Sequence, residues 1–238
     1  MKQLPYLNVG AGSTPKKAGS INADFYPGPN IDVVFDATQV WPFGDGSIGV
    51  VQSNHMLEHL HEPWNFFREA WRVLVPSSVA NLYIRVPYGP SEGGLGDMHH
   101  LRYFVPSSFA CVQPRYISCS KNPQYESWDA PFEVVAIYQR INPALRWLVK
   151  PVIRRWGQHV PKFLWGGYCE LIVGLRKLRR GEGVPQPGAV PVADVMYEHE
   201  YEGRVLQEGE EMRLLFFGEQ ADELQRQQDA RGDKHYAV

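Results

Sequence analysis

Histidine and glutamate side chains gather in the stretch SNHMLEHLHEP, residues 53–63, which holds three histidines and two glutamates. Histidine accepts or donates a proton near neutral pH, and both residue types bind metal ions. Within the stretch, residues 55–59 have the form H-x-x-E-H, the zinc-binding pattern of one group of metallopeptidases. The sequence therefore raises two kinds of chemistry here, metal binding and acid–base catalysis.

A zinc site of this form requires both histidines on one face of a long helix. An apolar, strand-like run ends immediately before His55, so we expect His55 in a turn and His59 in the segment that follows. Pro63 leaves little room for a long helix around His59. We therefore expect no metal ligands in this stretch, and a zinc hydrolase would depend on these histidines alone.

Short apolar segments that end at polar or glycine residues surround the stretch, as expected of strands buried in a parallel sheet. They are residues 6–12, 20–25, 31–38, 47–54 and 79–88. One helix is predicted over residues 62–76, because proline suits the first helical turn and aromatic residues then recur at helical spacing. This order predicts an α/β fold with a Rossmann-like, doubly wound, mostly parallel sheet.

The connections between the first three segments are shorter than the usual helical crossover between parallel strands. Only STPKKAGS (13–20) and YPGPN (26–30) are present there. Either the early helices are shortened to loops, or one strand pairs differently from the simple doubly wound scheme. We favour shortened helices, which leave one face of the first half of the sheet short of cover.

Six motifs in order resemble those of the class I S-adenosylmethionine-dependent methyltransferases, most closely the compact methyltransferase type 11 branch. They are LNVGAG (7–12), NAD (22–24), FDAT (35–38), PFGDGSIGVV (42–51), LEHL (57–60) and RVLVP (72–76). The stretch DMHHLRYF (97–104) resembles the segment that often follows the fifth strand of this family. The resemblance implies S-adenosyl-L-methionine as cofactor, bound across the carboxyl ends of the strands, and a methyl-transfer activity.

The resemblance also implies which residues hold the cofactor. Gly10 and Gly12 lack Cβ atoms, so the backbone can approach the methionine tail closely. Asp24 is expected at the ribose hydroxyls and Asp36 at the adenine amino group, although each aspartate could instead cap its own loop. The full expected set is Asn8, Gly10, Ala11, Gly12, Asp24, Phe25, Asp36, Ala37, Asn54 and His55.

Methyl transfer to an oxygen or nitrogen is an in-line displacement, in which the enzyme orients donor and acceptor and removes a proton. His59 and His100 are the candidate bases, and Glu58 is a candidate for orienting a histidine. Arg102 and Tyr103 are the candidates for binding a polar substrate, which we expect to be a small molecule or a saccharide.

Ser77 and Ser78 stand where this family usually has two glycines after RVLVP. Together with the shortened helices, this departure leaves a second function open. The chain would then be a methyltransferase-like protein that does not catalyse and serves as a binding or assembly module, such as a structural subunit of a larger particle.

The chain changes character after residue 140. Residues 141–180 carry nine lysines or arginines and one glutamate, whereas residues 194–238 carry twelve acidic and five basic residues. We predict an S-adenosylmethionine-binding core over residues 1–140 and a basic insertion and linker over 141–192, with two or three amphipathic helices up to residue 181. Residues 193–238 are predicted to hold the last strand of the sheet, near 211–217, and an acidic tail.

The basic segment 141–180 has three expected uses, in this order: packing on the sheet, contact between two chains of a homodimer, and peripheral contact with an anionic membrane surface or glycan. Nucleic-acid binding is not expected, because the net charge is –2 and no recognition motif is present. The sequence shows no apolar signal-peptide core and no C-x-x-C pair among its three cysteines. We therefore expect a cytoplasmic location.

Overall fold

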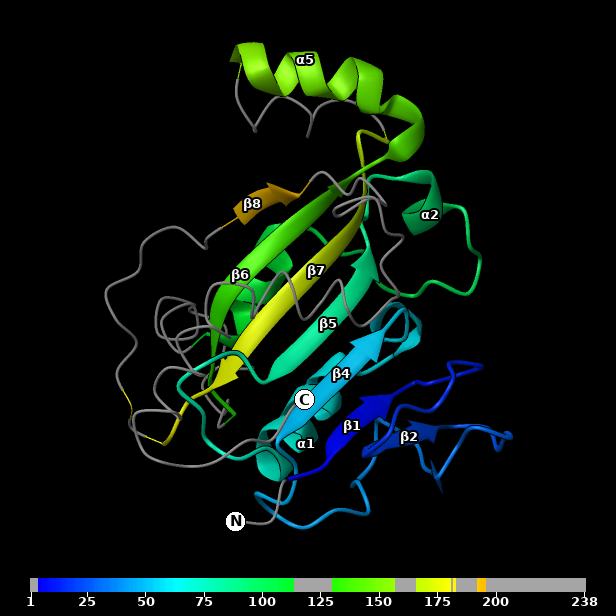
Figure 1. The fold of residues 1–238 in the computed structure, drawn as a ribbon, viewed down its shortest axis with the longest axis vertical. Helices are drawn as coiled ribbons and strands as arrows, with labels where there is room; N and C mark the ends of the chain where they lie inside the picture. The colour runs from blue at the N-terminus through cyan, green and yellow to red at the C-terminus, as the bar shows by residue number, and fades with distance from the viewer. Residues whose placement is uncertain (1–3, 114–129, 157–165, 181, 183–191, 196–238) are drawn as a thin grey trace. The chain divides into compact units, whose positions relative to one another are not determined.

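The structure is a computed structural model, and it describes residues 4–113, 130–156, 166–180, 182 and 192–195. In these residues the strands form one sheet in the order β3-β2-β1-β4-β5-β7-β6-β8 (Figure 1). The strands are β1 (Tyr6–Val9), β2 (Ser20–Asp24), β3 (Val33–Val34), β4 (Val50–Asn54), β5 (Leu82–Pro87), β6 (Phe132–Ile141), β7 (Tyr168–Lys177) and β8 (Val192–Val195).

The sheet has a parallel half and a mixed half. Strands β3, β2, β1, β4 and β5 pair in parallel, β7 is antiparallel to both β5 and β6, and β8 is parallel to β6. The chain builds outward from β1 through β2 and β3 on one side, and then through β4 and β5 on the other. Ligands of open parallel sheets bind outside the carboxyl ends of the strands where the order reverses, here between β1 and β4. The predicted α/β, Rossmann-like fold is confirmed.

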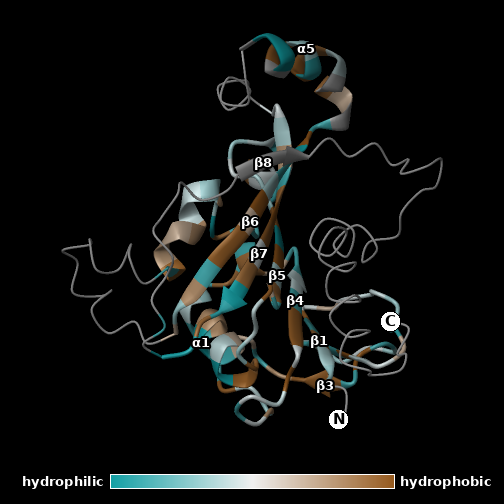
Figure 2. Ribbon diagram, turned by 60° about the vertical axis from the view of Figure 1, so that its left-hand side comes forward, coloured by the Kyte–Doolittle hydropathy of each residue, from teal (hydrophilic) through white to brown (hydrophobic). Residues whose placement is uncertain are grey.

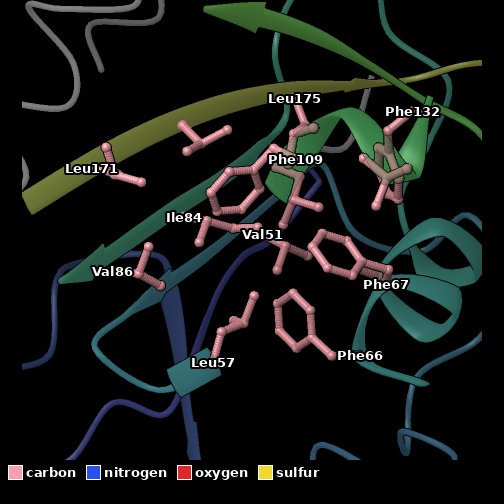
Figure 3. Close-up of a cluster of buried hydrophobic side chains, with 14 of the residues drawn as sticks. Val51, Leu57, Phe66, Phe67, Ile84, Val86, Phe109, Phe132, Leu171 and Leu175 are labelled. Carbon is pink, nitrogen blue, oxygen red and sulfur yellow. The ribbon is translucent and has the colours of Figure 1, made fainter. Parts of the chain in front are cut away.

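The hydrophobic core lies between the sheet and the helices that cover it. Helix α1 (Pro63–Val73) begins at a proline, which suits a first helical turn, and it buries Phe66 and Phe67. Figure 3 shows these rings beside residues of β4 and β5 and beside Phe109 of the 3-10 helix η2 (Pro106–Val112). Figure 2 shows hydrophobic residues along the strands of the sheet. The core thus fixes the strands whose carboxyl ends form the ligand-binding edge.

Helix α5 (Arg146–Trp156) follows β6 after the short 3-10 helix η3 (Pro143–Leu145). Val149 is buried, whereas Trp147 is 72% exposed, so one side of α5 packs and the other meets solvent. Among the helices of the described ranges, none is long and apolar enough to cross a membrane. The predicted homodimer and membrane contacts of the basic segment stay predictions.

The first two connections contain no helix in the described structure. Residues 10–19 and 25–32 form turns and bends, as the shortened-helix interpretation predicted. Buried Asn22 of β2 organises them, since its side chain donates to the carbonyl of Thr14 at 3.1 Å and its backbone amide donates to Asp32 at 2.9 Å. Polar side chains thus hold the chain where a longer connection would form a helix.

The prediction of helices throughout residues 142–181 was wrong in part. Residues 146–156 are helical, but residues 168–177 form β7, which inserts between β5 and β6. An apolar run buried on both faces has no periodicity that separates a strand from a helix. Strand β6 was not predicted at all. The predicted strand near 211–217 and the acidic tail lie outside the described residues.

Two predicted boundaries also changed. The segment predicted over 31–38 forms only the two residues of β3, and the helix predicted over 62–76 ends at Val73. Ser77 and Ser78 precede β5, so they lie at the amino end of that strand, opposite the edge where ligands are expected. The departure from Gly-Gly at these two residues therefore does not reshape the candidate site.

Candidate functional site

The glycine turn after β1 opens the site edge. Gly10 and Ala11 donate their backbone amides to the carbonyl of Ala23 at 2.9 and 3.0 Å, which ties the turn to the end of β2. Gly10 has a φ of +75°, and a Cβ atom there would lie 2.5 Å from Cγ of Met56. Gly12 has a φ of +53°, and a Cβ atom there would meet nothing within 4 Å. Gly10 is therefore required for close packing, whereas Gly12 faces open space.

Asp24, the last residue of β2, holds this turn in place. Its Oδ2 accepts the backbone amide of Gly12 at 2.8 Å, and its Oδ1 accepts the amide of Tyr26 at 3.0 Å. Each carboxylate oxygen can accept a second hydrogen bond. Phe25 and Tyr26 follow with 58% and 72% exposure, so two aromatic rings stand beside this carboxylate.

Asp36 and Ala37 lie in the loop after β3. Asp36 Oδ1 accepts both the amide of Thr38 at 2.8 Å and its hydroxyl at 2.6 Å, so this aspartate caps its own loop, as one of the two sequence interpretations held. The carbonyl of Ala37 accepts the indole N–H of Trp41 at 3.1 Å. The cap uses only Oδ1 of the carboxylate.

Asn8 lies beneath the turn rather than on its open side. Its side chain is buried in β1 and donates to Asn22 at 3.5 Å, and Asn22 in turn holds the loop at Thr14. Ala11 is buried as well. Of the ten residues expected around the cofactor, these two support the loop and Gly12 faces open space.

His55 follows Asn54 at the end of β4 and adopts a left-handed backbone conformation, with φ of +48°; no other non-glycine residue of the described chain has a positive φ. Its Nε2 lies 3.1 Å from Oε1 of Glu170, and Glu170 Oε2 accepts a hydrogen bond from Arg140 at 2.9 Å. Although burial opposes the change, the contacts with Glu170 and Glu58 raise the pKa of His55 to about 9. His55 is therefore a cation at neutral pH.

Glu170 is a site residue that sequence reasoning missed. It comes from β7, opposite Pro87 at the carboxyl end of β5. Burial opposes ionisation of this carboxyl, but His55 together with Arg85 and Arg140 lowers its pKa to about 2. The one available signal was that Glu170 is the sole acidic residue between positions 141 and 180.

Glu58 lies next to His55 in the 3-10 helix η1 (Leu57–His59), which Leu57 anchors in the core (Figure 3). The Glu58 side chain is 1% exposed, and neither carboxylate oxygen has a hydrogen-bond partner. His55 Nδ1 approaches Oε1 at 3.4 Å, an ion-pair distance without hydrogen-bond geometry. Glu58 is thus a buried carboxylate that has His55 as ion-pair partner but no hydrogen bond to either oxygen.

His59 and His100 face each other, with ring centroids 4.9 Å apart. Nδ1 of His59 lies 3.2 Å from the carbonyl of His99, and Nδ1 of His100 lies 2.8 Å from the carbonyl of Gly94. A carbonyl can only accept, so each neutral ring carries its proton on Nδ1 and a lone pair on Nε2. One ligand atom each of Glu58, His59 and His100 lies within 4.8 Å of the others.

The segment that carries His100 is fixed to η1 by its backbone. The amides of Leu101 and Arg102 donate to the carbonyl of Glu58 at 2.8 and 3.1 Å. The Arg102 guanidinium donates to the carbonyl of His61, and Tyr103 is 54% exposed. The structure therefore brings the three predicted catalytic residues together, whereas substrate binding by Arg102 and Tyr103 stays a prediction.

Comparison with known proteins gives one family. The family model described as "Methyltransferase domain" matches residues 16–80. The chain is 40% identical over 57 residues to an uncharacterized methyltransferase of Mycobacterium sp. (strain KMS), and the match covers 23% of each chain. It is 38% identical over 61 residues to one of Mycolicibacterium gilvum (strain PYR-GCK), covering 25% of this chain and 24% of the relative. The match thus spans about a quarter of the length of these relatives.

The solved structures that match are more distant in sequence. A SAM-dependent methyltransferase from Archaeoglobus fulgidus is 15% identical with a TM-score of 0.48, over 74% of this chain and 87% of the other. YcgJ from Bacillus subtilis is also 15% identical with a TM-score of 0.43, over 74% of this chain and 93% of the other.

The family match and the geometry concern the same part of the molecule. The matched residues 16–80 include Asp24, Asp36 and the turn of His55 to His59. These residues follow the carboxyl ends of β2, β3 and β4, on either side of the point where the strand order reverses. On this ground residues 16–80 are similar to the methyltransferase domain family, and they lie in a Rossmann-like α/β sheet.

Proposed function

We propose that this chain transfers a methyl group from S-adenosyl-L-methionine to an oxygen or nitrogen of a small molecule or saccharide. The observation that carries the proposal is the meeting of the glycine turn, Asp24 and the histidine pair at the one sheet edge where the strand order reverses. Cofactor binding and proton removal would then occur within one edge of the sheet.

The residues present fit the cofactor. Gly12 leaves open space over the turn, and Asp24 keeps acceptor capacity for two ribose hydroxyls beyond its contacts with the backbone. The exposed ring of Phe25 offers a flat surface beside Asp24 for the adenine base, with Asp36 and Ala37 in the next loop. Bound there, the cofactor supplies a methyl group activated by a sulfonium.

The acceptor proton would pass to a histidine. His55 is already protonated at neutral pH and cannot serve as the base. His59 and His100 each present an Nε2 lone pair, and the neighbouring Glu58 carboxylate would stabilise the imidazolium that forms. A charged His55 would instead help to orient polar groups beside the end of β4.

Titration calorimetry of the whole chain with S-adenosylmethionine tests the cofactor site. We expect micromolar binding, weakened at least about tenfold in Asp24→Asn, which keeps the side-chain shape but loses the charge and one of the two oxygens that accept backbone amides. Asp45→Asn is the matched control, because Asp45 pairs with Arg72 near the amino end of β4. Absence of binding in a folded protein would contradict the proposal.

The acceptor class is tested separately by release of S-adenosylhomocysteine with panels of sugars and of small amines. We expect turnover with one panel and a loss of at least about a hundredfold when both His59 and His100 are replaced by glutamine. Cofactor binding without turnover on either panel would favour a non-catalytic binding module.

A further inference from the structure

We propose that Glu58, His59 and His100 bind a first-row divalent cation of the Zn²⁺ or Mn²⁺ class. This site differs from the H-x-x-E-H pattern considered for the sequence, because His55 is not among its ligands. It also departs from the sequence expectation of no metal ligand in this stretch.

The first argument is the state of Glu58. A carboxylate that is 1% exposed, with no hydrogen bond to either oxygen, pays a large desolvation penalty. Buried polar groups in folded proteins nearly always have partners, and an orphaned one indicates an ion or water that belongs there. His55 Nδ1, 3.4 Å from Oε1, offsets part of the Glu58 charge as an ion-pair partner, but it leaves both oxygens without a hydrogen bond in the described structure.

The second argument is the orientation of the two imidazoles. Metal-binding histidines characteristically donate one ring N–H to a backbone carbonyl or carboxylate, which fixes the ring and directs the other nitrogen to the metal. His59 and His100 both show this arrangement, through the carbonyls of His99 and Gly94. The two rings have the same tautomer and lie beside a carboxylate. Together they form a set of nitrogen and oxygen ligands that suits Zn²⁺ and other first-row divalent cations.

The third argument is geometric. Metal–ligand bonds of about 2.0–2.2 Å place the ligand atoms of a tetrahedral site roughly 3.5 Å apart. The three ligand atoms already lie within 4.8 Å of one another, so small side-chain rotations complete the site. The backbone hydrogen bonds from Leu101 and Arg102 to Glu58 keep the two contributing segments together before any cation binds.

Three protein ligands leave at least one coordination position open, and the exposed side of His59 is where solvent or a ligand oxygen reaches it. This consequence rests on the proposed function: an acceptor hydroxyl on the cation would become more acidic and would lose its proton to solvent, so His59 and His100 would act as ligands instead of bases.

The test is Co²⁺ titration of the chelator-treated whole chain, followed by visible d–d absorption, with Zn²⁺ competition. We expect one saturable equivalent of Co²⁺, displaced by Zn²⁺. His100→Gln and Glu58→Gln should each weaken Co²⁺ binding by more than about tenfold. His99→Gln is the matched control, since the His99 side chain is exposed and contacts only its neighbour Asp97 in the described structure.

Thermal unfolding of each variant shows that it is folded, and His59→Gln replaces any variant that is not. No d–d absorption in the wild-type chain, or equal loss in His99→Gln and His100→Gln, would overturn the cation site. Titration of the same metal-free sample with S-adenosylmethionine keeps the two proposals separate. Cofactor binding without Co²⁺ binding rejects the cation site alone, and Co²⁺ binding without cofactor binding rejects the cofactor site alone.

Discussion

At the scale of single residues, two histidines four positions apart have opposite electrostatic surroundings. His55 lies between Glu58 and Glu170 and is charged, whereas His59 donates to a backbone carbonyl and offers a lone pair. The sequence of residues 53–63 predicted histidines that take part in acid–base catalysis or metal binding. It did not predict which histidine is charged and which offers a lone pair. That distinction depends on Glu170 and His100, which only the folded chain brings near.

Glu170 should make stability depend on pH in the acid range. Its pKa is about 2 in the folded chain against an ordinary value of 4.5, because His55 and two arginines outweigh the opposing effect of burial. A lowered folded-state pKa contributes stability above pH 4.5 that is lost as the pH falls through this interval. We expect Glu170→Gln to lower the free energy of unfolding by about 2 kcal/mol at pH 7. The stability of the variant should also depend less on pH in the acid range.

Urea unfolding of wild type and Glu170→Gln between pH 7 and 3.5 measures this difference. The difference in free energy of unfolding between the two proteins should become smaller as the pH falls below 4.5. A difference in free energy of unfolding that stays constant with pH would mean that the pKa of Glu170 is not lowered in the folded chain. Glu92→Gln, at an exposed position, is the control.

The two glycines of the turn should respond differently to alanine. Gly10→Ala combines a positive φ with a Cβ that would lie 2.5 Å from Met56. We therefore expect its free energy of unfolding to fall by more than about 2 kcal/mol. Gly12→Ala carries only the backbone strain, about 1 kcal/mol, because its Cβ meets open space. Thermal unfolding of both variants checks the order, and equal losses would contradict it.

At the scale of elements, polar loops replace helices in the first half of the sheet. The sequence predicted this from connection length, and it predicted the parallel strands from apolar runs ending at polar residues. It did not predict β6 and β7, because their pairing joins segments far apart in the chain, and because the central residues of β7 are buried on both faces and so show no periodicity. β3 is shorter than predicted because only two of its residues pair with β2.

Asn22→Ala should loosen the loop over residues 10–19. The variant removes the hydrogen bond to the carbonyl of Thr14 and leaves the Asn8 side chain without its acceptor. We therefore expect the free energy of unfolding to fall by about 1–3 kcal/mol. Hydrogen exchange of this loop should become faster by a larger factor than that of α1, which responds only to the change in global stability. Gln39→Ala, at an exposed position, is the control, and unchanged exchange in Asn22→Ala would refute the role given to this side chain.

At the scale of the whole molecule, one sheet joins a parallel half that carries most of the site to a mixed half that contributes Glu170. A ligand that binds only the folded chain raises its stability by mass action. At a hundredfold excess over its dissociation constant, S-adenosylmethionine should add about 2.7 kcal/mol and raise the Tm by roughly 5–10 °C. At the same concentration Asp24→Asn should lose at least about half of this shift in thermal unfolding, and Asp45→Asn should keep it.

The place of β7 between β5 and β6 also sets an order of events during synthesis. β5 is buried along its whole length, yet its neighbour on one side arrives only when residues 168–177 leave the ribosome. Until then the nascent chain presents an open apolar strand edge, the kind of surface that pairs with other chains and attracts chaperones. A message truncated after the matched segment 16–80 and β5 should therefore yield aggregating protein, however complete its cofactor motifs are.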